Sequence, residues 1–216
     1  MKTISAKSKD LKSINQAIRQ SVNGAPVTVS SAAHLDGLAA GLKLGEVIVQ
    51  GQAGDYLGVL NAGATIQVTE GAGRFAADNM TAGTVIIEGD AGYGAAQYCY
   101  GGTVIIRGNA GDFTATMNKG AVIIVCGDVG HDAGTYMLKG DLVIVGNAGH
   151  NLANCLIRGS VYIGGEWQSL GHNTRLAPLT DEDVAKLQAF FDTHGIQAAP
   201  ATFKKIIAAS EKPFYK

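Results

Sequence analysis

Residues 83–96 read Gly-Thr-Val-Ile-Ile-Glu-Gly-Asp-Ala-Gly-Tyr-Gly-Ala-Ala, and residues 102–115, 19 positions later, read Gly-Thr-Val-Ile-Ile-Arg-Gly-Asn-Ala-Gly-Asp-Phe-Thr-Ala. Each copy joins a short β-branched run to a unit of the form Gly-x-x-Gly-x-x-x-(Gly/Ala). This unit recurs six times at a period of 19 residues, and a fixed period of this length indicates a repeat architecture. The glycines expected at its corners are Gly51, Gly54, Gly58, Gly73, Gly89, Gly92, Gly108, Gly111, Gly127, Gly130, Gly134, Gly146 and Gly149.

The β-branched runs predict strands that stack along the chain. Seven short runs rich in Val and Ile occur, from Val47–Val49 to Val161–Ile163. One such strand cannot bury its apolar side alone, but copies in successive coils can pair in parallel at about 4.8 Å. The glycines would supply positive φ or a close approach between coils. Because the every-sixth-residue pattern of left-handed hexapeptide solenoids is absent, we predict an all-β solenoid, a right-handed parallel β-helix of about seven 19-residue coils.

The predicted β-helix spans residues 27–172, and we expect short α-helical caps at both of its ends, because solenoid ends must be closed. Residues 1–26 are predicted to form an N-terminal helical cap that ends at Gly24. Apolar residues recur there at helical spacing, namely Leu11, Ile14, Ile18 and Val22.

Residues 173–216 are predicted to form a C-terminal helical extension. Thr180 followed by Asp183 resembles a capping box, and Gly195 ends the apolar pattern that follows. These signals predict a helix between the capping box and Gly195. A second short helix is predicted over about residues 202–209.

Composition excludes several classes of protein. Of 30 glycines, 25 lie between Gly45 and Gly165, and that segment carries five Lys or Arg against ten Asp or Glu, a net charge of −5. We therefore expect no nucleic-acid partner. No stretch approaches the roughly 18 apolar residues of a membrane span, so we expect a soluble, cytoplasmic protein with no membrane partner. The cysteines, predicted to be buried free thiols because no C-x-x-C pair occurs, are Cys99, Cys126 and Cys155.

The position directly after the second glycine of each unit is polar in every coil. A solvated ladder of side chains is the favoured interpretation, and a partner or channel face is the first alternative. The second alternative is a metal ion shared by His131, His150 and Asp112. We predict no catalytic, cofactor-binding or metal-ligating residue in the chain. The members of this polar column are Asp36, Asp55, Arg74, Tyr93, Asp112, His131, His150 and Ser169.

Both faces of the predicted sheet are apolar. The middle residues of the runs, which share one face, are as apolar as their neighbours. That face must be covered by the terminal helices or by another subunit, since monomers rarely expose a long apolar stripe. Ile105 and Ile123 are therefore candidate partner-contact residues. The full predicted column is Ile48, Ile66, Ile86, Ile105, Ile123, Val143 and Tyr162.

One segment matches a nucleotide-binding fingerprint. Gly71-Ala-Gly-Arg-Phe-Ala76 fits G-x-G-x-x-G/A, but that fingerprint needs a helix directly afterwards to receive the pyrophosphate. The next strand is predicted to begin at Val85, so we interpret the segment as a corner of the solenoid.

The glycine units resemble the GXGXG domain that closes the large subunit of glutamate synthase. They are clearest as Gly51-Gln-Ala-Gly-Asp-Tyr-Leu-Gly58 and Gly127-Asp-Val-Gly-His-Asp-Ala-Gly134, and the resemblance covers roughly residues 45–172. It implies a right-handed β-helix that packs against an FMN-containing synthase barrel and a glutamine amidotransferase domain and carries no catalytic residue. The sequence departs from the pattern at Glu70, which replaces a corner glycine.

Within this family, the chain is most similar to the stand-alone GXGXG subunit of N-methylglutamate synthase (methylamine–glutamate N-methyltransferase). The similarity rests on the length and on the ending Gly159–Gly171 followed by the helix Asp181–His194. It implies a non-catalytic structural subunit of a hetero-oligomeric, glutamate-synthase-like amidotransferase complex that forms N-methylglutamate from methylamine and glutamate. The implied partners are a glutamine-amidotransferase-like subunit and an FMN/iron–sulfur glutamate-synthase-like subunit. FMN and the iron–sulfur cluster would belong to that partner, with no cofactor in this chain.

Three alternatives remain. The resemblance also fits the GXGXG subunit of archaeal-type glutamate synthase and the C subunit of formylmethanofuran dehydrogenase. An independent carbohydrate-active β-helix protein is the alternative from another class. Asp55 and Asp112 share a column three coils apart, a separation of about 14 Å that is too long for a glycosidase pair.

Overall fold

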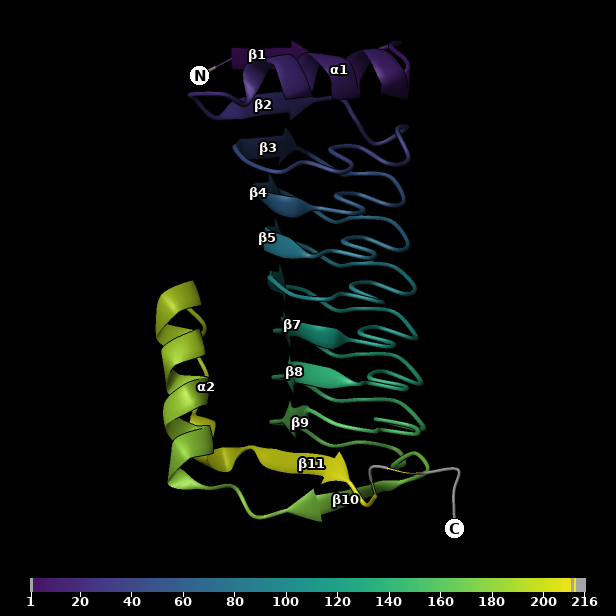
Figure 1. The fold of residues 1–216 in the computed structure, drawn as a ribbon, viewed down its shortest axis with the longest axis vertical. Helices are drawn as coiled ribbons and strands as arrows, with labels where there is room; N and C mark the ends of the chain where they lie inside the picture. The colour runs from purple at the N-terminus through teal and green to yellow at the C-terminus, as the bar shows by residue number, and fades with distance from the viewer. Residues whose placement is uncertain (1, 211, 213–216) are drawn as a thin grey trace.

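The computed structural model describes residues 2–210 and Lys212. The chain forms a parallel β-solenoid of about seven turns with coils of about 19 residues, and two helices lie outside the coils (Figure 1). The predicted solenoid and its repeat length are confirmed.

Stacked parallel strands form one wall of the solenoid. In the described part of the chain, nine strands pair in sequence order, each with the next. Val47 stacks on Ile66 and Ile66 on Val85, and all three side chains are fully buried inside the coils. The strands are β1 (Lys2–Ser5), β2 (Val27–Ser30), β3 (Glu46–Gln50), β4 (Ala62–Val68), β5 (Ala82–Ile87), β6 (Thr103–Ile106), β7 (Lys119–Val125), β8 (Lys139–Ile144) and β9 (Ser160–Ile163).

The opposite side of each coil is a left-handed turn. The backbone φ is positive at Tyr56, Gly58 and Leu60, and at the equivalent three residues of the next five coils. A left-handed residue other than glycine costs about 1–2 kcal/mol. Backbone hydrogen bonds between coils offset this cost. The amide of Tyr56 donates to the carbonyl oxygen of Arg74 in one neighbouring coil, and the amide of Gly58 donates to the carbonyl oxygen of Leu38 in the other, both at 2.8 Å.

The second glycine of each unit serves a different purpose, which is close approach between coils. A Cβ atom on Gly130 would lie 2.6 Å from the amide nitrogen of Asp112 in the preceding coil. On Gly111 it would lie 2.8 Å from the amide nitrogen of Tyr93. No side chain fits at such distances, so these positions require glycine.

The N-terminal cap contains the predicted helix and one further strand. Helix α1 (Leu11–Ser21) begins after the N-cap residue Asp10, buries Ile14 and Ile18, and crosses the end of the solenoid (Figure 1). Strand β1 precedes it and pairs in parallel with β2. The sequence does not predict β1, because Ile4 is its only apolar residue.

The C-terminal extension contains the predicted helix and two strands. Helix α2 (Asp181–His194) begins at the capping box of Thr180 and Asp183 and ends at left-handed Gly195, as predicted. Strand β10 (Thr174–Ala177) precedes α2, and a 3₁₀ turn (Pro200–Thr202) and strand β11 (Lys204–Ala208) follow it.

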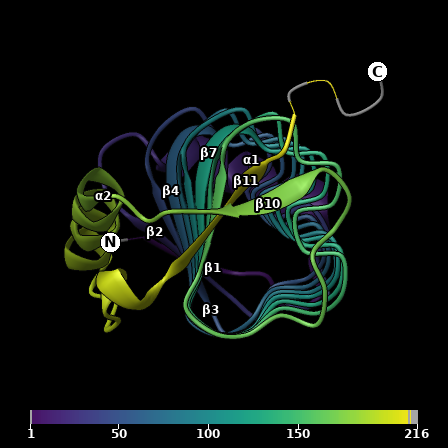
Figure 2. The same ribbon diagram turned by 90° about the horizontal axis from the view of Figure 1, so that it is seen from below.

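The predicted second helix over residues 202–209 is wrong, because most of that segment forms β11. This strand lies antiparallel between β9 and β10, and together β10 and β11 cross the end of the solenoid (Figure 2). The solenoid coils alone pair only one edge of β9, and β11 supplies partners for the N–H and C=O groups along the other edge. A strand pairs with that edge whereas a helix cannot, so the edge decides the local structure.

Candidate functional site

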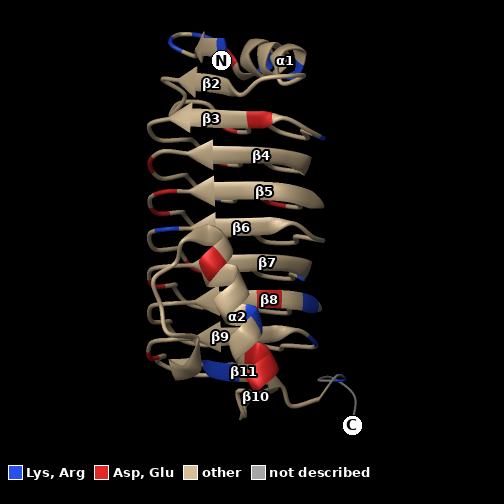
Figure 3. Ribbon diagram, turned by 90° about the vertical axis from the view of Figure 1, so that its left-hand side faces the viewer, with Lys and Arg blue, Asp and Glu red and all other residues tan. Residues whose placement is uncertain are grey.

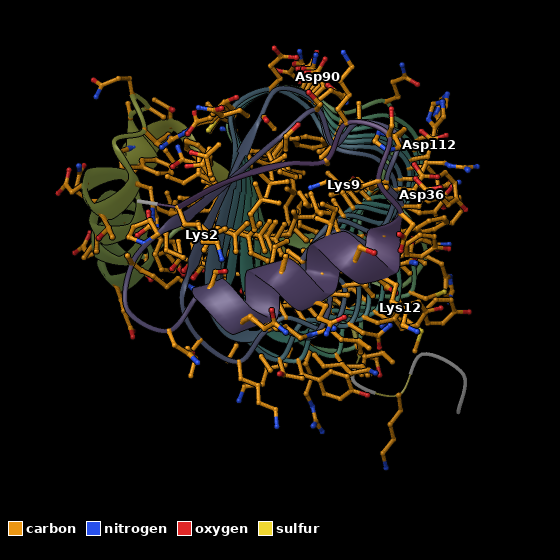
Figure 4. All side chains as sticks on the ribbon, turned by 90° about the horizontal axis from the view of Figure 1, so that it is seen from above. Lys2, Lys9, Lys12, Asp36, Asp90 and Asp112 are labelled. Atoms are coloured by element: carbon orange, nitrogen blue, oxygen red, sulfur yellow. The ribbon has the colours of Figure 1, made fainter. Side chains whose placement is uncertain are left out.

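The polar column lies on the side of the solenoid away from α2, where Figure 4 shows Asp36 and Asp112. Its aspartates and His131 accept backbone N–H groups of the next coil. Asp36 Oδ1 accepts from the amide of Asp55 at 2.9 Å, and Asp112 Oδ1 accepts from that of His131 at 2.7 Å. His131 Nδ1 accepts from the amide of His150 at 2.9 Å. The column is therefore a ladder that joins successive coils, in addition to being solvated.

A second polar column, three residues earlier in each coil, forms the same kind of ladder. Asp90 Oδ1 accepts from the amide of Asn109 at 2.7 Å, and Asn109 Oδ1 accepts from that of Asp128 at 2.8 Å. Asp128 Oδ1 then accepts from the amide of Asn147 at 2.7 Å. Both columns satisfy backbone donors that the tight corners leave without a carbonyl partner.

The two consecutive histidines stack on each other. The rings of His131 and His150 have centroids 5.3 Å apart and planes 20° from parallel. Because the amide of His150 occupies the Nδ1 lone pair of His131, that atom is not open to a metal ion. Among residues 2–210 and 212, no three His, Cys, Asp or Glu side chains come together in a group that could hold a metal ion.

Beside the polar column runs a continuous stack of four rings, which we call the aromatic ladder: Tyr56, Phe75, Tyr93 and Phe113. Successive ring centroids are 4.9, 5.5 and 5.3 Å apart. Phe75 leans over Gly94, where a Cβ atom would lie 2.7 Å from its ring. The repeat places Tyr93 in the polar column, but the ladder draws its rings from two adjacent columns, so the column pattern alone does not reveal it.

Arg74 is the only Lys or Arg in the two polar columns, and it binds the neighbouring carboxylate. Its Nε donates to Asp55 Oδ2 at 2.8 Å, and its Nη2 lies 2.7 Å from the same atom. The hydrogen bond from the Arg74 side chain is the main reason that the pKa of Asp55 lies below its ordinary value.

The outward column of the sheet differs from the prediction at two residues. Ile66 and Ile123 point into the core and are fully buried, so the assignment of Ile123 as a partner contact is wrong. In β7 the apolar run begins at outward-facing Val122, which pairs with Thr103, so it starts one residue earlier than the run in β6. The second residue of the run in β7 therefore points inward, whereas the second residue of the run in β6 points outward. The observed column is Ile48, Gln67, Ile86, Ile105, Ile124, Val143 and Tyr162.

Helix α2 covers the most apolar part of this outward column. It packs over β7–β9 (Figure 3), where Leu187 and Phe191 belong to one buried cluster with Ile124 and Val143. Ile105 is also fully buried. A terminal helix, one of the two predicted covers, therefore accounts for this stripe. The uncovered part, over β3–β5, is polar apart from half-buried isoleucines.

A buried polar network fixes α2 to the solenoid, and no pattern in the sequence predicts it. The hydroxyl of Tyr162 donates to Asp183 Oδ1 at 2.6 Å, and Lys205 Nζ donates to both carboxylate oxygens at 2.8 Å. Nearby, Lys186 Nζ donates to Asp141 Oδ1 at 3.0 Å and lies 4.7 Å from the Tyr162 ring centroid. The only sequence signal is the capping box, which reveals the local role of Asp183 but not its distant partners.

The network predicts how stability depends on pH. Burial raises the pKa of Asp183, but hydrogen bonds from Lys205, Tyr162 and Thr180 outweigh it and hold the pKa well below its ordinary value. A carboxyl group with a lowered pKa stabilises the fold above its unfolded pKa, about 3.9, and this contribution is lost as pH falls through the folded pKa.

We expect Asp183→Asn to lower the free energy of unfolding by about 3 kcal/mol at neutral pH, because Lys205 loses its buried counter-ion. The difference from the wild-type protein should begin to shrink below about pH 4 and continue to shrink as pH falls towards the folded pKa. Urea unfolding at several pH values measures both effects, with exposed Asp192→Asn as the control. Equal stability at neutral pH, or a gap that widens in acid, contradicts the network.

The cysteines differ in their burial. Cys99 and Cys155 are buried, as predicted, whereas Cys126, which directly follows β7, is only half-buried. All three are free thiols. Burial raises the pKa of Cys99 to about 12, which leaves that thiol protonated at neutral pH and unreactive.

The segment Gly71–Ala76 leads through a turn into strand β5, not into a helix. It forms a solenoid corner, as predicted, and lacks the helix N-terminus on which a dinucleotide pyrophosphate would rest.

Comparison with protein-family models gives no match for this chain, and comparison with curated proteins gives none either. In the part of the chain that the structure describes, no helix has the length and hydrophobicity to cross a membrane.

Proposed function

We propose that this chain is a structural subunit of a glutamate-synthase-like amidotransferase complex, and that a partner subunit binds the side formed by its left-handed turns. One observation carries the proposal. Among the described residues, seven large hydrophobic side chains are strongly exposed, and five of them are one of the three left-handed residues of a turn or lie within two residues of one. The five are Tyr56, Leu60, Tyr93, Tyr100 and Tyr136.

Such a concentration favours a protein partner. Scattered exposed hydrophobic residues need no explanation, but a group on one face marks an interaction site. Tyrosine in particular is enriched in protein interfaces and in their energetic hot spots. These side chains come from three alternate coils of one rigid solenoid, which suits a support for a neighbouring subunit.

The resemblance of the glycine repeat supports the identity of the complex. N-methylglutamate synthase is the favoured member, and the subunits of archaeal-type glutamate synthase and formylmethanofuran dehydrogenase are the alternatives within the family. A glutamine-amidotransferase-like subunit and an FMN/iron–sulfur synthase-like subunit would carry out the chemistry. This chain would hold them in position, and the flavin and the cluster would belong to the synthase-like partner.

The carbohydrate-active alternative receives less support. Asp55 is bound by Arg74, and Asp112 accepts a backbone N–H of the next coil. Both carboxylates therefore have partners within the solenoid, and the two stand three coils apart, too far for the carboxylate pair that glycoside hydrolysis requires.

Leu60→Asp tests the proposed surface. Leu60 is 57% exposed and left-handed, a backbone conformation that aspartate adopts more readily than leucine, so the variant should fold normally. We expect its affinity for the partner subunits to fall by about tenfold or more, because a charge replaces an apolar contact. Light scattering of the mixed subunits and titration calorimetry measure assembly.

Leu176→Asp is the matched control, because Leu176 is 49% exposed but lies on β10 at the end of the solenoid. It should assemble like the wild-type protein. If both variants assemble normally, or both lose affinity equally, the turn side is not the binding surface.

A further inference from the structure

We infer that the aromatic ladder and the two polar columns beside it bind a basic segment of the partner, one that presents Arg or Lys side chains. This inference rests on the proposed function, since the partner bound on this side would supply the segment. The resemblance to the GXGXG domain implies partner subunits but does not say which of their side chains contact this chain.

Negative charge is concentrated around the two polar columns. The two polar columns, with the left-handed position that follows them, contain seven carboxylates and a single guanidinium. The whole chain has a formal net charge of only −1, so negative charge is concentrated on this side. Complementary charge steers a partner and fixes its orientation. The carboxylates are Asp36, Asp55, Asp90, Asp112, Asp128, Asp132 and Glu166.

Three of the four residues in the aromatic ladder have a left-handed backbone conformation. Tyr56, Phe75 and Phe113 all have φ between 57° and 60°, which is unfavourable for bulky side chains. The equivalent residues of other coils are Gly94 and Asp132, which adopt this conformation readily. The rings are therefore present despite a backbone cost, and the repeat itself does not require them.

Stacking within the ladder explains the rings only in part. Tyr56 and Phe75 are nearly parallel, with planes 21° apart, but Tyr93 is turned 79° from Phe75 and 47° from Phe113. Aromatic pairs of this kind stabilise by about 0.5–1.5 kcal/mol. Tyr56 and Tyr93 nevertheless stay 40% and 42% exposed. A tilted, exposed ring offers its face to a cation, whereas sugar binding favours a flat, open row of ring faces.

Arg74 provides an internal example of the carboxylate part of such a contact. Its guanidinium binds Asp55 at 2.7–2.8 Å while its side chain remains 66% exposed. Asp112 stands in the same column two coils after Arg74 with no cation beside it among the described ion pairs. An arginine of a partner could bind Asp112 from the solvent side, beside the exposed ring of Tyr93.

A short fluorescent peptide of alternating Arg and Gly is the probe, with the same peptide carrying Glu in place of Arg as its control. Fluorescence anisotropy with the full chain should show salt-sensitive binding of the Arg peptide only. We expect Tyr93→Ser to weaken binding by about fivefold to tenfold. Asp112→Asn should weaken it by about threefold, and asparagine retains the oxygen that accepts the His131 amide.

Two variants are matched controls. Leu176→Ser removes an exposed hydrophobic side chain on β10, 49% exposed and outside the proposed binding surface, and Asp192→Asn removes an exposed carboxylate on α2. Both should bind the peptide like the wild-type protein. Equal losses in the controls and the ladder variants overturn the inference, as does binding of the Glu peptide, or binding of a short β-linked glucan with none of the Arg peptide.

The inference and the proposed function can fail separately. If Leu60→Asp disrupts assembly but the Arg peptide does not bind, the basic segment is wrong and the structural subunit stands. If the peptide binds as expected but the partner subunits do not assemble with the chain, the identity of the complex is wrong and the basic-ligand surface stands.

Discussion

Replacing Gly130 with valine is expected to prevent the chain from folding at physiological temperature. A Cβ atom there would lie 2.6 Å from the amide nitrogen of Asp112. The two coils cannot separate to admit it, because the Gly130 amide donates to the Ala110 carbonyl oxygen at 3.0 Å. Proteins are stable by only about 5–15 kcal/mol, and a steric clash of backbone against backbone belongs to the most destabilising class of substitution. Circular dichroism and thermal unfolding measure the loss.

Gly41 supplies the control that separates this clash from left-handed backbone strain. Its φ is +64°, and a Cβ atom there meets no atom within 4 Å. Gly41→Ala should cost about 1 kcal/mol, while Gly130→Ala, which adds the same single carbon, should cost several times more. Equal stabilities of the two alanine variants would mean that the coils are not as closely stacked as described.

Ile123→Asp is expected to unfold the chain as well. Ile123 lies inside the solenoid and is fully buried, so an aspartate there would be a carboxylate without a partner in an apolar core. Such a group costs many kcal/mol or must take up a proton. We expect no cooperative thermal transition and early elution of expanded protein in gel filtration at neutral pH.

Ile86→Asp is the matched variant on the other face of the sheet. Ile86 is half-buried and points outward above the region that α2 covers, so it should retain the fold with a modest loss of stability. The pair tests the strand register directly. If Ile123→Asp folds and Ile86→Asp does not, the inward and outward faces have been exchanged.

The repeat predicts the solenoid because each of its features has a local physical cause. Strands follow from β-branched runs, and close stacking follows from the glycine at Gly111 and Gly130. Left-handed conformation was less visible in the sequence, since Ala77 and Ala96 adopt it as Gly58 does. Hydrogen bonds to both neighbouring coils compensate for these residues, and that compensation exists only in the stacked structure.

Elements that depend on the ends of the solenoid were harder to predict. The segment around Phe203 and Ile206 has a pattern that fits a helix or a strand, and the free edge of β9 selects the strand. β1 has almost no apolar signal and forms because β2 offers it an edge. In both cases a tertiary contact, not local propensity, decides the structure.

In the candidate surfaces, too, the sequence predicts local features but not the tertiary contacts. The polar column was identified from its 19-residue spacing, but the amides that its side chains bind belong to the next coil. The network of Tyr162, Asp183 and Lys205 joins residues 21 and 22 positions apart across α2, β9 and β11. Its geometry depends on where α2 packs, which no pattern within α2 reveals.

Purification of the chain at its natural expression level, followed by light scattering, absorption spectroscopy and peptide identification, tests the proposed function most directly. We expect a hetero-oligomer in which this chain elutes in fixed ratio with a glutamine-amidotransferase-like subunit and a synthase-like subunit, and which shows flavin absorbance. A chain that elutes alone as a colourless monomer, at concentrations where the complex should be assembled, would contradict its role as a structural subunit.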